Sequence, residues 1–158
     1  SGVFEHRVLK RKSPLFRGFD DVFWMPHSRL FTVPEDKVDA IDDLEKMAVS
    51  EEAGIAILKR KDSSQFFFIG HPEYDSLTLA GEYERDTIRG IDPKIPAHYF
   101  PDDDPTRRPI VRWRSAGQLL YSNWLNYYVY QSTPYDVSAI DGSEEHAGDD
   151  FGNDENEV

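Results

Sequence analysis

Residues 65–75 read QFFFIGHPEYD, and this stretch decides the fold that we expect. Its three consecutive phenylalanines predict a strand over 65–69 that is buried on both faces. Pro72 disfavours helical geometry at the residue before it, so His71 should leave the end of the strand in an extended conformation. The stretch therefore predicts a central strand that runs into a turn carrying an imidazole.

Short strands are expected before this stretch. Alternating or apolar runs predict strands over 2–8, 44–49 and 54–59. Because only a few residues separate the later strands, they should form an antiparallel meander that ends in the 65–69 strand.

Helices are predicted over 34–40, 76–89 and 115–131, with Thr32, Asp75 and Ser115 as the capping residues. Gly90 should end the second helix. Five prolines between residues 91 and 109 predict a loop without regular structure. The third helix carries Leu120, Trp124, Tyr127 and Tyr128 on one face. This face is too apolar for water, so the helix must cover a sheet or meet a partner subunit.

Composition and charge limit the functions that the chain can have. The 158 residues include no cysteine, which excludes disulfides, cysteine-ligated zinc and a cysteine nucleophile within this chain. The net charge is −12, and eight of the acidic residues lie in 141–158, which holds no Lys or Arg. We expect a domain over 1–140 and a disordered acidic tail over 141–158. The acidic balance argues against a nucleic-acid partner, and no run approaches the ~18 apolar residues that span a bilayer.

The strongest chemical signal is His71 with Glu73 two residues later. A carboxylate beside an imidazole fixes its tautomer and stabilises the imidazolium, so the pair can act as a general base. The alternative is that the two side chains only tie down a turn. No second histidine lies at ligand spacing, and no metal is therefore expected.

Two other groups of residues invite a more ordinary interpretation. Arg107, Arg108, Arg112 and Arg114 could bind phosphate, but pairing of a solvated segment with Asp102–Asp104 is favoured. His27 and Arg29 are expected in ordinary loop packing and solvent contact.

Several stretches together carry a family resemblance: RGFDD (17–21), PHSR (26–29), residues 70–85, WRS (113–115), NWLNYYVYQ (123–131) and TPYD (133–136). Over about residues 1–136 the chain resembles the C-terminal half of the homoserine O-acyltransferases, which comprise O-succinyl- and O-acetyltransferases. The segment GHPEYD more broadly resembles the His/Glu segment of class I glutamine amidotransferase-like domains. The resemblance implies an α/β fold that is part of such a domain, with a mixed sheet flanked by helices.

The resemblance also implies a reaction and residue roles. It implies a cytoplasmic enzyme of methionine biosynthesis that transfers an acyl group from acyl-coenzyme A, with acetyl preferred and succinyl possible, to the hydroxyl of L-homoserine. His71 would be the general base, Glu73 its orienting acid, and Ser28 and Arg85 would bind homoserine. The residue types agree, because an Arg fork can hold a carboxylate bidentately. No cofactor is implied beyond acyl-coenzyme A as co-substrate.

Arg85 raises a geometric question. It lies ten residues beyond Asp75, or roughly 15 Å along an ideal helix. The helix must therefore run alongside the pocket or begin later than Asp75.

The missing cysteine departs from the family, whose acyl group passes through an active-site cysteine. The chain begins at Ser1 in mid-strand pattern, so we expect the nucleophile in a missing N-terminal half of the same protein. We expect this chain alone to be inactive, because loss of the nucleophile typically lowers kcat about a million-fold. A homodimer is possible. The alternatives are a glutamine amidotransferase-type hydrolase and a non-catalytic binding protein.

Overall fold

The computed structural model describes residues 1–132. The expected acidic tail at 141–158 and the end of the expected domain at residue 140 lie outside these described residues.

Within residues 1–132, five strands form one sheet, in the order β2-β1-β3-β4-β5. They are β1 (Gly2–Val8), β2 (Val22–His27), β3 (Leu44–Ser50), β4 (Gly54–Arg60) and β5 (Phe66–Phe68). All four strand pairs are antiparallel, and the expected meander of β3, β4 and β5 is confirmed. An isolated bridge between Gly2 and Ala97 adds a parallel contact.

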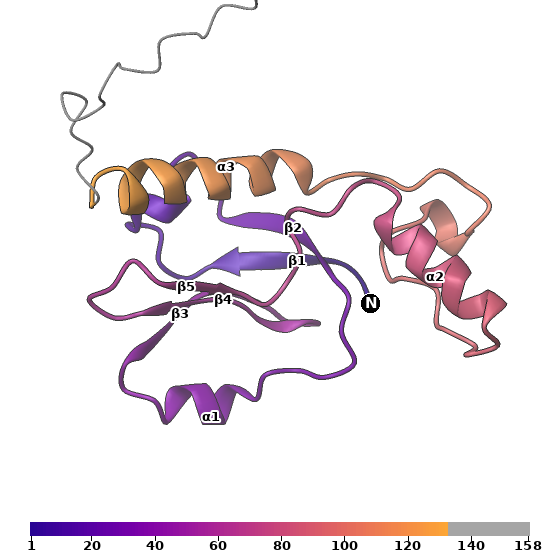
Figure 1. Cartoon of the computed structure of the whole chain (residues 1–158), viewed down its shortest axis with the longest axis horizontal. Coiled ribbons are helices and arrows are strands. Elements are labelled where there is room, and N and C mark those ends of the chain that lie inside the picture. Colours follow the sequence, from indigo (N-terminus) through magenta and orange to yellow (C-terminus); the bar gives the residue numbers. More distant parts are fainter. Residues whose placement is uncertain (133–158) are drawn as a thin grey trace, which may run out of the picture.

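Helices lie on both sides of this sheet, which confirms the expected α/β class. Figure 1 shows α1 (Glu35–Asp39) on one side and α3 (Arg114–Trp124) on the other. Helix α2 (Thr78–Ile88) lies beyond the end of the sheet near the N-terminus. The shorter helical segments are η1 (Pro14–Phe16), η2 (Pro101–Asp103) and the π-helical η3 (Leu125–Val129), which continues α3.

The helices occupy the predicted segments, but the predicted caps are wrong. The capping positions are Pro34, Leu77 and Trp113, and none of them makes a side-chain capping bond. At the start of α3, the side chain of the capping residue Trp113 is buried, with only 1% exposed, and its packing holds the helix end in place of a capping hydrogen bond. Gly90 ends α2 as predicted, with a φ of +72° that favours glycine.

Both edges of the sheet differ from expectation. Strand β2 was not predicted, because Pro26 argues against a central strand. It is an edge strand, where a residue without a backbone N–H is tolerated.

Strand β5 was expected to be central and buried on both faces, and this is wrong within the described part of the chain. It forms the other edge, and Phe67 is 45% exposed.

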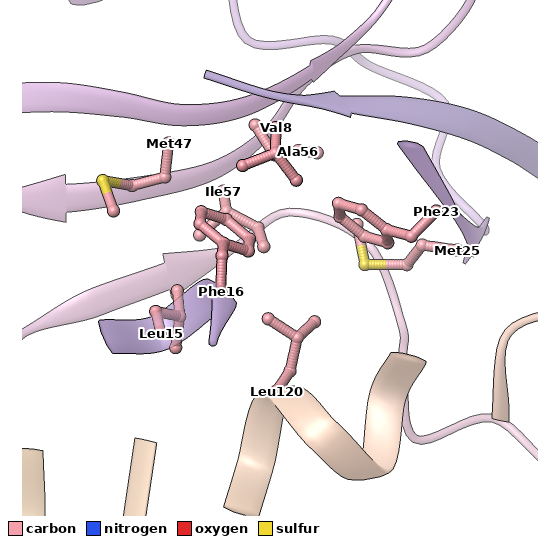
Figure 2. Close-up of a cluster of buried hydrophobic side chains, with 10 residues drawn as sticks. Val8, Leu15, Phe16, Phe23, Met25, Met47, Ala56, Ile57 and Leu120 are labelled. Carbon is pink, nitrogen blue, oxygen red and sulfur yellow. The ribbon is translucent and has the colours of Figure 1, made fainter. Parts of the chain in front are cut away.

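The main core lies between α3 and the sheet. Figure 2 shows Leu120 rising from α3 toward Phe16 and Met25. Leu120 is fully buried, and Trp124 and Tyr128 pack against the same cluster. The expectation that this aromatic helix covers a sheet is therefore confirmed.

A second cluster fixes α2 to the long loop that follows it. Its buried members are Val3, Leu79, Tyr99, Phe100 and Trp113. The loop is irregular over most of its length, as predicted, but its aromatic residues order it against α2 and β1.

Within residues 1–132 none of the helices combines the length and the apolar character that crossing a bilayer requires.

Candidate active site

The turn after β5 is pressed against β2 at Gly70. A Cβ atom on Gly70 would lie 2.7 Å from Met25 Cε and 2.8 Å from the Pro26 carbonyl oxygen. The next residue, His71, donates its backbone N–H to that same carbonyl at 2.8 Å. Only glycine fits here, and the close approach fixes the backbone of His71 to β2.

Helix α3 holds the same turn from the other side. A Cβ atom on Gly117 would lie 2.5 Å from the Pro72 carbonyl oxygen. The indole N–H of the buried Trp113 donates to the Tyr74 carbonyl at 2.9 Å. Residues 71–74 are therefore clamped between β2 and the start of α3, which gives the local turn a rigid frame.

His71 and Glu73 contact each other as predicted. His71 Nδ1 lies 2.8 Å from Glu73 Oε1, and the side chains are 36% and 51% exposed. Because a carboxylate only accepts, Nδ1 carries the proton of the neutral ring and Nε2 keeps its lone pair. No described residue hydrogen-bonds to Nε2. The Tyr121 hydroxyl lies 3.5 Å from the other oxygen of Glu73. The arrangement is that of an accessible base with its orienting acid.

Tyr74 connects this pair to the neighbouring helix. Its ring stacks on the His71 ring, with centroids 4.3 Å apart and an interplanar angle of 16°. Its hydroxyl donates to Glu82 Oε1 at 3.0 Å. Burial, followed by the bond to Glu82, raises the pKa of Tyr74 to about 12. Tyr74 therefore stays protonated and remains a donor at neutral pH.

Ser28, the residue after the end of β2, contacts the same carboxylate. Its hydroxyl donates to Glu82 Oε2 at 2.6 Å. Each oxygen of Glu82 thus accepts one hydroxyl hydrogen, and His71, Tyr74, Glu82 and Ser28 form a continuous chain of contacts.

A cavity of about 450 Å³ opens beside this chain. Ser28 and Arg85 both line it, together with Glu82. Helix α2 begins at Thr78 and not at Asp75, which is one of the two arrangements expected for a helix that brings Arg85 to the pocket. The Arg85 guanidinium pairs with Asp86 at 2.8 Å.

The structure thus brings the predicted residues together in two groups. Ser28 and Arg85 share one cavity, and His71 contacts Glu73 outside its lining. Tyr74 and Glu82 join the two groups, and sequence reasoning missed both. The spacing of Glu82 and Arg85, three residues apart on one helix, was the available signal.

His27 was expected in ordinary loop contact, and this is wrong. It is 2% exposed, and its Nε2 lies 2.9 Å from Nε2 of the fully buried His6. Burial lowers the pKa of His6 to about 4; burial and then the neighbouring His6 lower that of His27 to about 3. At neutral pH the pair is uncharged and shares one hydrogen bond. It lies directly under the turn, since His27 Nε2 would be 2.8 Å from a Cβ atom on Gly70.

The arginines considered as a possible phosphate site do not gather in one place. Arg107 pairs with Asp102, as the favoured interpretation expected. Arg112 lies over the Trp24 ring, 4.6 Å from its centroid. Trp113 is buried and offers no aromatic surface beside them. Over residues 1–132 no group of three or more metal-ligating side chains gathers.

Comparison with known proteins adds a family. The family model described as homoserine O-succinyltransferase matches residues 1–135. A homoserine O-acetyltransferase of Petrotoga mobilis is 52% identical over 140 residues, and a homoserine O-succinyltransferase of Tolumonas auensis is 54% identical over 141. Each alignment covers 89% of this chain and 45% of the relative, so the chain spans somewhat less than half the length of these proteins.

A solved structure shares the fold. The crystal structure of SMU.1228c superposes with a TM-score of 0.52 at 16% identity, over 79% of this chain and 50% of that one. The likeness is one of fold alone.

Proposed function

The chain belongs to the homoserine O-succinyltransferase family, and we propose that its protein transfers an acyl group from acyl-coenzyme A to the hydroxyl of L-homoserine. The observation that carries the proposal is the 2.8 Å contact between His71 Nδ1 and Glu73 Oε1, which leaves Nε2 available as a base. Relatives that are named homoserine O-acetyltransferase and homoserine O-succinyltransferase are 52% and 54% identical to this chain, and they support homoserine as the acyl acceptor.

The first half of the reaction loads the enzyme. His71 Nε2 takes the proton of a cysteine thiol, and the thiolate attacks the thioester carbonyl of acyl-coenzyme A. The carbon–sulfur bond to coenzyme A breaks, and the imidazolium returns the proton to the leaving thiolate. Glu73 holds the ring and stabilises its positive charge meanwhile.

The second half passes the acyl group on. Ser28 and Arg85 hold homoserine in the cavity, with the guanidinium on the substrate carboxylate. His71 takes the proton of the homoserine hydroxyl, the alkoxide attacks the acyl-cysteine, and the proton goes to the departing cysteine thiolate. The products are an O-acylhomoserine and the free enzyme.

The nucleophile comes from outside these 158 residues, which hold no cysteine. We propose that the other part of the same protein supplies it. This chain alone should therefore be inactive in practice, with an acyl-transfer rate about a million-fold below that of the whole protein.

Acetyl-coenzyme A is the donor we propose, with succinyl-coenzyme A as the alternative. Relatives of both names match the chain about equally, so a direct comparison of the two donors must decide. We also propose, from the family resemblance, that the protein acts in methionine biosynthesis in the cytoplasm. The same resemblance is the basis for proposing a homodimer.

The test is coenzyme A release by the whole protein, measured with a thiol reagent that is added only after the reaction has been quenched. We expect sustained release from acetyl-coenzyme A only when homoserine is present, with no more than one equivalent per active site in its absence, and neither by His71→Ala. Ammonia release from glutamine without acyl transfer would indicate the amidotransferase-type hydrolase instead. Homoserine binding without either reaction would indicate a non-catalytic protein.

A further inference from the structure

The Glu82 carboxylate forms no ion pair with a basic side chain within residues 1–132. It lies half-buried on α2 and accepts hydrogen bonds from Ser28 at 2.6 Å and from Tyr74 at 3.0 Å. Within residues 1–132 no Lys, Arg or His nitrogen lies within 4.0 Å of it. Arg85, one turn further along, pairs with Asp86 instead. Two hydroxyls hold Glu82 in position, but its negative charge is not neutralised.

The charged side chains that line the cavity beside Glu82 are equal in number for the two signs. They are Arg29, Arg85 and Lys94 against Glu82, Asp86 and Asp92. A ligand that is itself positive at one end and negative at the other matches such a cavity without adding net charge. A free α-amino acid is a ligand of this kind.

The positions of the charges favour one orientation. Glu82 and Arg85 are three residues apart on α2, so their side chains project from the same face of the helix. A guanidinium binds a carboxylate, and a carboxylate binds an ammonium group. Glu82 is also the cavity anion that contacts Tyr74 and through it the His71 ring, at the chemical end of the site.

We propose that Glu82 binds the α-ammonium group of the acyl acceptor and so selects amino acids over other alcohols. The hydroxyls of Ser28 and Tyr74 position its carboxylate, and Arg85 takes the opposite end of the substrate. The inference deepens the proposed function and rests on it.

The test compares two acceptors in the whole protein: homoserine, and 4-hydroxybutanoate, which lacks only the amino group. Glu82→Gln keeps the size of the side chain and removes its charge. We expect the KM for homoserine to rise about 10- to 100-fold and the preference for homoserine over 4-hydroxybutanoate to fall by a similar factor. Formation of the acyl-enzyme from acyl-coenzyme A should not change, which also shows that the variant is folded.

The matched control is Glu84→Gln, which removes a charge from an exposed position on the same helix outside the cavity. Glu84→Gln should change neither the KM for homoserine nor the preference for homoserine over 4-hydroxybutanoate. If Glu82→Gln slows both acceptors equally, Glu82 only supports the structure and the inference is wrong. If the unsubstituted protein acylates neither acceptor, the proposed function itself fails, and the inference falls with it.

Discussion

At the scale of single residues, Glu73 decides which nitrogen of His71 would act as the base in the proposed reaction. Its carboxylate accepts from Nδ1 and directs the lone pair of Nε2 outward. The contact between His71 and Glu73 was predictable from sequence, because the two residues are near neighbours and Pro72 constrains the turn. The contact of Glu82 with Ser28 was not, because Ser28 lies 54 residues away along the chain, just after the end of β2.

Loss of the Glu73 charge should reveal this role. Glu73→Gln offers an amide where the imidazolium needs an anion, so kcat should fall about 1,000- to 10,000-fold. Steady-state kinetics of the whole protein measure the effect, with Glu51→Gln in the exposed turn between β3 and β4 as the control. A fall of less than tenfold would show that Glu73 only ties down the turn.

At the scale of elements, the segments of the helices α1–α3 and of the strands other than β2 followed from the sequence pattern, but their surroundings did not. Pro26 hid an edge strand, and the phenylalanines of β5 suggested a central strand where the described sheet has an edge. Single-segment patterns show which residues are apolar, but the strand order that buries or exposes them depends on distant pairing. The close contact of α3 with the turn, at Gly117, also left no local signal.

That contact makes Gly117 sensitive to a single methyl group. In Gly117→Ala the new Cβ would meet the Pro72 carbonyl at 2.5 Å, so α3 must shift, and the free energy of unfolding should drop by about 1–3 kcal/mol. Gly81→Ala is the matched control, because nothing lies within 4 Å of its Cβ in α2. There we expect stabilisation by about 0.5–1 kcal/mol. Urea unfolding measures both, and equal effects would contradict the clamped turn.

At the scale of the whole molecule, the buried pair of His6 and His27 should make stability depend on pH. Their folded-state pKa values, about 4 and about 3, lie below the ordinary 6.5. The unfolded chain therefore binds protons that the folded protein excludes, so their contribution is complete above pH 6.5 and is lost as pH falls below it. Between pH 6.5 and 5 the free energy of unfolding should decrease by about 2–4 kcal/mol.

The double variant His6→Gln/His27→Gln isolates this effect from the many carboxylates of the chain. Its urea-unfolding midpoint should vary less between pH 6.5 and 5 than that of the unsubstituted protein. An identical pH dependence in both proteins would mean that the pair does not exclude protons.

The central claim is that His71 activates a nucleophile supplied by another part of the same protein. The most direct measurement is intact mass spectrometry of the whole protein, quenched within its first turnover with acetyl-coenzyme A. We predict one acetyl group on a cysteine, discharged when homoserine is added, and no such adduct within that time in His71→Ala. An adduct that forms equally fast without His71, or acyl transfer to homoserine with no adduct on the protein, would contradict the account.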